Sequence, residues 1–324
     1  MHEACGICGI YAPGDDVARL AYFGLYALQH RGQESAGIAT ADGERLHIYT
    51  EMGLVAQVFN ERILSSLPGH ISIGHTRYST TGSSRQRNSQ PIMIDGPHEQ
   101  MAIAHNGNVI NAGELRQELL EQGIQFTTST DSEVVGYLIA TSPGRDWPER
   151  IRAAMRRFQG AYCLVILTRD SLFAVRDPLG VRPLCLGRIN GDWVIASESC
   201  ALAHIGATLC REIEPGEIVS VDATGMRSFP REEQGRRAIC MFEYIYLARP
   251  DSVINGRLLY PARLAMGAML AREHNVEADL VIGVPDSATA AAIGYAQESG
   301  IQFSDGLVKN RYVGRTFIQP DQRL

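Results

Sequence analysis

The chain has 324 residues, a formal net charge of −6 and 45% hydrophobic residues. This length and composition are typical of a globular protein with two domains. The negative charge argues against a general nucleic-acid binder, and no apolar run is long enough to span a membrane. The N-terminus shows no signal peptide, and the odd number of cysteines, 7, favours a reducing cytoplasm over a disulfide framework.

The first two thirds of the chain predict strands, then helices, then strands again. The strands expected before residue 110 are 5–11, 37–40, 46–49, 70–78 and 101–105. Helices are expected at about 16–29 and 111–123, and from about 131 and 146. Asn111 and Glu114 predict a capping box for the second of these helices. Short strands return between 161 and 195, with a turn at 189–192, so the pattern predicts a layered α+β domain.

The composition changes at residues 229–237, a polar and turn-rich run that we interpret as a linker. After it, helices at 261–275 and 287–299 alternate with expected strands at 279–284, which we predict to be buried, and 302–307. This alternation is typical of the start of an α/β unit. We therefore expect one domain at 5–235 and a second, incomplete one at 236–324, after a short leader at 1–4.

Cys5 lies close enough to the N-terminus to become the first residue if that leader is removed. Its α-amine, with a pKa of roughly 7.7–8.0, would then serve as the base for its own thiol. Cys5 alone is also consistent with a buried structural cysteine, or with half of a redox or zinc pair with Cys8. Residues three apart on a strand face opposite ways, which disfavours such a pair.

Four polar clusters follow Cys5, at residues 30–35, 75–80, 105–108 and 130–133. The side chain of Asn106 and the backbone N–H of Gly107 could stabilise the oxyanion of an acyl-transfer reaction. Arg77 could bind a substrate carboxylate and Asp131 a substrate ammonium.

Each cluster also has a structural interpretation. Residues 105–108 could be a plain hairpin turn, since Asn-Gly is a common turn dipeptide. Asp131 could be only a helix N-cap, and Arg77 could pair with a structural carboxylate. The occurrence of all the clusters in this order behind Cys5 favours a catalytic site.

Residues 5–7 and the four clusters together resemble the glutaminase domain of class II glutamine amidotransferases, which are N-terminal-nucleophile hydrolases. The resemblance extends to about residue 230 and implies a four-layer αββα sandwich, with residues 1–4 as a propeptide. It implies that Cys5 attacks the side-chain amide of L-glutamine and forms a γ-glutamyl thioester. It further implies that glutamine is bound by Arg31, Arg77, Thr80 and Asp131.

Residues 240–252, 283–287 and 309–317 resemble the amidophosphoribosyltransferase family. This resemblance implies a type I phosphoribosyltransferase domain, in which ammonia displaces pyrophosphate from phosphoribosyl pyrophosphate. The product would be 5-phosphoribosylamine, in the first step of de novo purine biosynthesis. The residues implied in substrate binding are Asp286, Ser287, Lys309, Arg311 and Tyr312, with Ser287 also a contact for Mg²⁺.

The loop around Lys309, the only lysine in the chain, suits a charged pyrophosphate, because lysine is a compact point charge. The structural alternative is a solvated basic loop.

Members of the family are usually homo-oligomers inhibited by purine nucleotides. Cys240 matches the position of the first ligand of a [4Fe-4S] cluster found in many members, so a cluster is possible in the full-length protein.

The sequence departs from the family in one respect. We do not find the paired acidic residues and the Gly/Thr-rich turn of the main phosphoribosyl pyrophosphate loop. The chain therefore looks truncated, and we expect it to retain at most glutaminase activity and to lack a complete fold beyond about residue 253.

Two other functions remain open from the sequence. One is a different class II amidotransferase, for example one acting on a sugar phosphate. The other is a non-catalytic binding module in which Cys5 is never exposed.

Overall fold

In the computed structural model, the chain divides into two compact units, one extending to Ile239 and the other beginning at Cys240. The structure describes residues 5–78, 85–231 and 235–310. The boundary that we predicted, between 235 and 236, lies in the same connecting segment.

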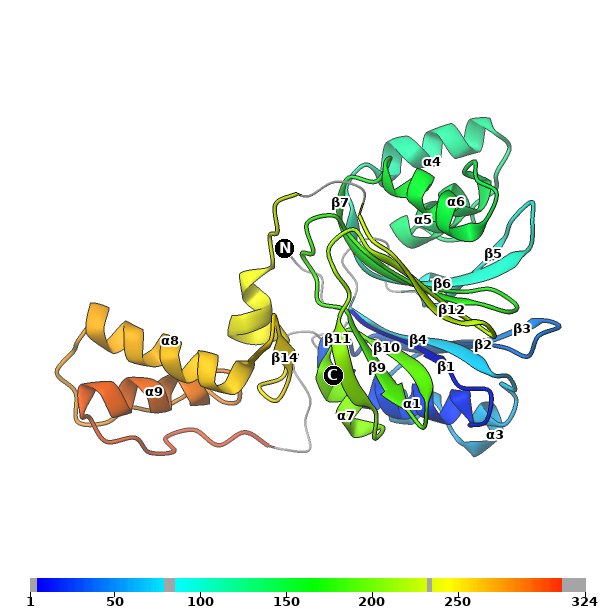
Figure 1. Ribbon diagram of the computed structural model, residues 1–324. Helices are drawn as coiled ribbons and strands as arrows, with labels where there is room; N and C mark the ends of the chain where they lie inside the picture. Colours follow the sequence, from blue (N-terminus) through cyan, green and yellow to red (C-terminus); the bar gives the residue numbers. More distant parts are fainter. Residues whose placement is uncertain (1–4, 79–84, 232–234, 311–324) are drawn as a thin grey trace. The chain divides into compact units, whose positions relative to one another are not determined.

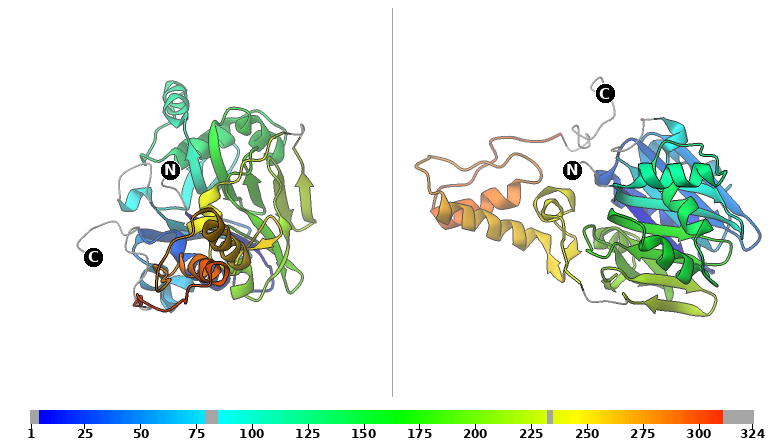
Figure 2. Two further views of the ribbon diagram at one scale, coloured as in Figure 1. Left: turned by 90° about the vertical axis from the view of Figure 1, so that its left-hand side faces the viewer. Right: turned by 90° about the horizontal axis from the view of Figure 1, so that it is seen from above.

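The first unit contains two antiparallel sheets. The strands of the first sheet, in spatial order, are β11 (Thr208–Glu212), β9 (Cys185–Ile189), β10 (Asp192–Ala196), β1 (Gly6–Tyr11), β4 (Ile71–Arg77), β2 (Ser35–Ala41) and β3 (Leu46–Met52). Those of the second are β13 (Gly225–Phe229), β12 (Ile218–Asp222), β8 (Leu172–Arg176), β7 (Gly160–Leu167), β6 (Gln100–Val109) and β5 (Ile92–Asp95). The two sheets lie face to face (Figures 1 and 2).

Helices cover the outer face of each sheet (Figure 1). The helices against the first sheet are α1 (Val17–Ala27), α2 (Val55–Val58), α3 (Glu61–Leu64) and α7 (Ser199–His204). Those against the second sheet are α4 (Ala112–Glu121), α5 (Asp131–Thr141) and α6 (Trp147–Met155). Short 3₁₀ turns, η1 (Gln29–Arg31) and η2 (Gln86–Asn88), lie in the connections between these elements.

Three apolar layers hold these four structural layers together. Ile7, Ile73 and Val165 are fully buried between the two sheets. Leu25 of α1 is fully buried against the first sheet, and Ile139 of α5 against the second. Because each sheet has one face on its partner and the other on helices, both faces are apolar. The predicted four-layer αββα sandwich is confirmed.

Local signals set several element boundaries. Asp16 caps α1 by accepting a hydrogen bond from the Arg19 amide, and Asp146 caps α6. Asn190 and Gly191, both at positive φ, form the turn between β9 and β10. The predicted turn at 189–192 is therefore confirmed.

The predicted capping box at Asn111 is wrong, although α4 starts directly after this residue. The Asn111 side chain instead donates to the Arg157 carbonyl at 2.9 Å and accepts from the Gln159 amide at 3.0 Å. Both partners are distant in sequence, so a tertiary contact uses the oxygen that would cap the helix.

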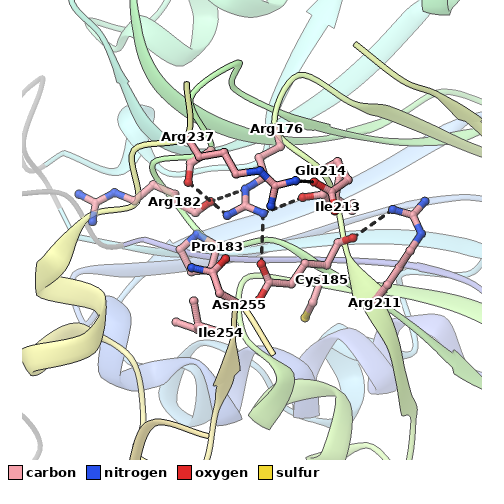
Figure 3. Close-up of polar contacts among 12 residues, drawn as sticks. Arg176, Arg182, Pro183, Cys185, Arg211, Ile213, Glu214, Arg237, Ile254 and Asn255 are labelled. Carbon is pink, nitrogen blue, oxygen red and sulfur yellow. Dashed lines mark hydrogen bonds and ion pairs between the residues drawn. The ribbon is translucent and has the colours of Figure 1, made fainter. Parts of the chain in front are cut away.

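Arg176, at the end of β8, is a buried structural arginine (Figure 3). Its guanidinium donates to the carbonyls of Ile213 at 2.6 Å, Arg182 at 2.8 Å and Gly180 at 3.2 Å. These bonds tie the loop after β8 to the segment after β11, because a planar guanidinium can serve several carbonyls at once.

The second unit contains a π-helical turn η3 (Glu243–Leu247), a small hairpin of β14 (Val253–Ile254) and β15 (Arg257–Leu258), and helices α8 (Leu259–Glu273) and α9 (Thr289–Ser299). The two helices pack closely at glycines. A Cβ at Gly267 would lie 1.8 Å from the Ala291 carbonyl oxygen, and one at Gly294 would lie 2.0 Å from that of Leu264.

The strands predicted at 279–284 and 302–307 in this unit are much shorter than predicted. Among the described residues they form one parallel bridge, between Val281 and Phe303. The predicted buried run is largely exposed, with Leu280 and Ile282 at 44% and Val284 at 64%. A parallel strand is buried on both faces only inside a larger covered sheet, which these residues do not supply.

Within the described ranges, no helix combines the length and apolar character needed to cross a membrane.

Candidate functional site

Cys5 lies directly before β1, with its side chain buried against the end of β4. The Tyr78 amide donates to Cys5 Sγ at 3.4 Å, and the thiol lies 3.6 Å from the Tyr78 carbonyl oxygen. The Cys5 carbonyl accepts a hydrogen bond from Arg31 Nε at 3.1 Å. The two contacts with Tyr78 follow from the β1–β4 register, in which Gly6 pairs with Thr76. The structure thus brings Cys5 together with the first two polar clusters.

Cys8 belongs to a different part of the core. It is packed beneath α1, on the outer side of the first sheet, and burial raises its pKa to about 12. Ile7, which shares the face of Cys5 on the strand, points instead into the layer between the sheets. A Cys5–Cys8 redox or zinc pair is therefore wrong.

Asn106 and Gly107 lie within β6, paired with Cys163 and Tyr162 of β7, so the hairpin-turn interpretation is wrong. Asn106 is fully buried, and within the described part of the chain neither Nδ2 nor Oδ1 of its side chain has a hydrogen-bond partner. Buried amides are almost always paired in folded proteins. The amide of Asn106 therefore has the property expected of a group that awaits a ligand.

Two features of the backbone at Gly107 exclude any residue with a side chain at this position. Its φ is +150°, and a Cβ at this position would lie 2.1 Å from the carbonyl oxygen of Ala161. The backbone at Gly107 can adopt this geometry within β6 only because glycine has no Cβ.

His75 connects the two sheets at this site. Its Nε2 lies 3.2 Å from the His105 carbonyl oxygen, so β4, whose end contacts Cys5, meets β6 one residue before Asn106. The Nδ1 atom of His75 has no partner among the described residues. The neutral tautomer protonated on Nε2 satisfies this arrangement, and burial followed by the charge of Arg77 lowers the pKa of His75 to about 3.

This buried neutral histidine predicts acid sensitivity. In the unfolded chain His75 binds a proton below about pH 6.5, whereas in the folded protein it stays neutral down to about pH 3. Stability should therefore fall as the pH drops from 6.5 towards 3, by about 2 kcal/mol at pH 5. Urea titrations of wild type and His75→Gln between pH 7 and 4 measure this slope, which should be shallower in the variant. An equal slope in both proteins would refute the assignment, and the exposed His98→Gln serves as the control.

Asp131 is the first residue of α5 and not its N-cap, so the cap interpretation is wrong. Thr130 accepts the capping hydrogen bond from the Glu133 amide. The carboxylate of Asp131 accepts from the Val109 amide at 3.0 Å and lies 3.6 Å from His105 Nδ1. Asp131 is thus held at the end of the strand that carries Asn106.

The two predicted glutamine-binding arginines both contact carboxylates of the protein. Arg77 donates to Glu34 at 2.8 Å, and both side chains are 3% exposed, so the structural pairing proposed as its alternative is confirmed. Arg31 is fully buried and forms an ion pair with Glu198. Contact of either arginine with glutamine stays a prediction, and Thr80 lies outside the described residues.

In the second unit, the structure brings together two of the predicted substrate residues. Lys309 Nζ donates to Asp286 Oδ2 at 2.9 Å, with Ser287 next in the chain. Arg311 and Tyr312 lie outside the described residues.

Two carboxylates of the site were missed as candidates by sequence analysis. Glu198 lies shortly after β10 and Glu34 lies in the first polar cluster, and both are almost fully buried. A glutamate between a buried strand and a short helix, as in Ala196–Ser199, is a weak signal that could have indicated Glu198.

Comparison with known proteins gives a consistent picture. A sequence profile described as the glutamine amidotransferase domain matches residues 75–204. The amidophosphoribosyltransferase of Synechococcus elongatus is 52% identical over 99% of this chain and 66% of its own length. That of Mus musculus is 45% identical over 100% of this chain and 69% of its own. The chain therefore spans just under two thirds of the cyanobacterial relative.

Comparison with solved structures agrees with the sequence relatives, and the match includes residues of both units. A Bacillus subtilis glutamine phosphoribosylpyrophosphate amidotransferase, solved with ADP and GMP, matches with a TM-score of 0.90 and 44% identity. The match covers 98% of this chain and 69% of that protein. On these similarities, together with the four-layer fold around Cys5, the chain belongs to the amidophosphoribosyltransferase family.

Proposed function

We propose that this chain hydrolyses L-glutamine at Cys5 and releases ammonia. The observation that carries the proposal is the buried amide of Asn106, which has no partner among the described residues and lies beside a glycine that admits no side chain. An unpaired amide costs about 1–3 kcal/mol of stability. Its retention in a buried strand next to the Cys5 region is best explained by a ligand that it binds during the reaction.

The reaction would begin once residues 1–4 have been removed. The free α-amine of Cys5 takes the thiol proton, and Sγ forms a bond to the side-chain amide carbon of glutamine. The carbonyl oxygen becomes an oxyanion, which the side-chain N–H of Asn106 and the backbone N–H of Gly107 stabilise. The α-amine then gives its proton to the leaving nitrogen, the carbon–nitrogen bond breaks and ammonia departs.

Water completes the cycle. The α-amine accepts a proton from water as the water oxygen attacks the γ-glutamyl thioester, and the same oxyanion site is used again. The carbon–sulfur bond breaks, Cys5 regains its proton, and glutamate is released. Arg77 and Asp131 have the charges needed to bind the α-carboxylate and α-ammonium of glutamine.

In the complete protein, we propose that ammonia displaces pyrophosphate from phosphoribosyl pyrophosphate to give 5-phosphoribosylamine, in purine biosynthesis. Asp286 and Ser287 offer oxygen atoms, the ligand type that Mg²⁺ prefers, and Lys309 offers a cation for phosphate. Bound Mg²⁺ would neutralise the charge of the pyrophosphate.

A [4Fe-4S] cluster on Cys240 stays a prediction for the complete protein. Within the described residues, Cys240 is not part of any group of three or more potential metal ligands. A cluster at this position would therefore need ligands from outside the described part of the chain.

The other partners are also proposals. We propose a cytoplasmic homo-oligomer inhibited by purine nucleotides. The 7 cysteines, which are all present as thiols, support a reducing compartment. The ADP and GMP bound by the B. subtilis relative support nucleotide control.

Intact-mass analysis before and after treatment with a diazoketone analogue of glutamine tests the glutaminase. We expect a chain that begins at Cys5 and gains a single adduct on that residue. Cys210, an exposed cysteine, is the control, because Cys210→Ser should leave the adduct unchanged. A chain that keeps residues 1–4 and gains no adduct would instead support a non-catalytic binding module.

A further inference from the structure

Glu198 is a buried carboxylate with two basic partners. It lies between β10 and α7, and its side chain is fully buried. One carboxylate oxygen contacts both the Arg31 guanidinium and His30 Nε2, the latter at 2.7 Å. Buried ion pairs contribute little net stability, because desolvation of the charges offsets their attraction. Stability alone is therefore a poor explanation for this cluster.

Arg31 connects Glu198 to the proposed nucleophile. While one terminal nitrogen of its guanidinium contacts Glu198, Nε donates to the carbonyl oxygen of Cys5 at 3.1 Å. The planar guanidinium can hold both partners in a fixed geometry, which a lysine ammonium cannot reproduce. The carboxylate of Glu198 thus fixes the group that holds the Cys5 carbonyl.

Ser197, the residue before Glu198, forms hydrogen bonds with the backbone of Ile7 in β1. Ser197 donates its amide to the Ile7 carbonyl at 3.0 Å, and its hydroxyl oxygen accepts from the Ile7 amide at 3.0 Å. Residues 197–198 therefore hold the start of β1 at two points, Ile7 directly and Cys5 through Arg31.

The hydrogen bond from Arg31 to the Cys5 carbonyl matters because Cys5 becomes a chain terminus if residues 1–4 are removed. A terminal residue is attached to the fold on one side only, so its carbonyl contact fixes how its thiol and amine are directed. We propose that Glu198 is a positioning residue for Cys5, acting through Arg31. The inference rests on the proposed glutaminase function and assigns Arg31 a role that differs from glutamine binding.

The variant Glu198→Gln, made in the chain described above, tests the proposal. We expect kcat for glutamine hydrolysis to fall about tenfold to a hundredfold, because small misplacements of a nucleophile have effects of this size. The KM for glutamine should change less than about threefold, since Arg77 and Asp131 are untouched. The rate of Cys5 modification by the diazoketone should fall in parallel with kcat.

Glu217→Gln is the matched control. Glu217 is also almost fully buried and also bonds an arginine, Arg211, but it lies directly before β12 of the other sheet. Its replacement should lower thermal stability without changing kcat. If both variants lose activity in proportion to stability, the role of Glu198 is structural and the proposal is wrong.

Arg31→Lys provides a second test if Glu198→Gln does not fold. The lysine keeps a positive charge beside Glu198 but cannot also hold the Cys5 carbonyl. A lower kcat with little change in KM supports positioning, whereas a higher KM with normal kcat shows that Arg31 binds glutamine and overturns the proposal. A folded Glu198→Gln protein with wild-type kcat overturns it as well. Failure of the wild-type chain to form any Cys5 adduct would instead remove the glutaminase function, and this inference with it.

Discussion

Replacement of Asn106 by leucine is expected to lower kcat for glutamine hydrolysis about 10²- to 10³-fold, with KM nearly unchanged. Loss of one oxyanion donor has an effect of this size, because the donor acts on the transition state more than on bound substrate. The same substitution should leave the thermal stability unchanged or slightly higher. It replaces a buried amide that lacks a partner among the described residues by an apolar side chain of similar size.

Steady-state kinetics and thermal unfolding of Asn106→Leu measure the two effects. Asn111→Ala, further along the chain, is the control, because the Asn111 side chain bonds to Arg157 and Gln159. This variant should lose about 1 kcal/mol of stability and keep its kcat. An Asn106→Leu protein that is clearly destabilised but still active would contradict the oxyanion assignment.

Replacement of Gly107 by alanine is expected to destabilise the first unit by more than about 3 kcal/mol and to abolish glutaminase activity. The new Cβ would lie 2.1 Å from the Ala161 carbonyl oxygen and 2.7 Å from the Cα of Tyr162, at a φ of +150°. Neither neighbour can move without breaking the β6–β7 pairing, so strain and lost hydrogen bonds add.

Urea unfolding of Gly107→Ala and Gly113→Ala separates this effect from a general response to alanine. Gly113 lies in α4, where an added Cβ would meet no atom of the described residues within 4 Å. Alanine at this helical position should stabilise the protein by about 0.5–1 kcal/mol. Wild-type stability in Gly107→Ala would show that the backbone of β6 is not constrained as described.

The sequence was sufficient for features that depend on local patterns. The helices α1 and α6 begin close to the predicted residues 16 and 146, because the carboxylates of Asp16 and Asp146 can reach free amides of the first turn without help from the rest of the fold. The turn at Asn190–Gly191 follows from the tolerance of these residues for positive φ. The four-layer sandwich was predicted from the motifs around Cys5, and the family from residues 240–252, 283–287 and 309–317, and both are confirmed.

Features that depend on distant partners required the tertiary structure. The sequence left residues 105–108 open between a turn and a site, and only the pairing of β6 with β7 places Asn106 in a buried strand. The contact of Glu198 with Arg31 joins residues 167 positions apart, which no local pattern reveals. The run at 279–284 has the composition of a buried strand, yet burial requires neighbours on both sides. Motif and periodicity thus determined the family and most elements, whereas pairing and burial decided which side chains form the site.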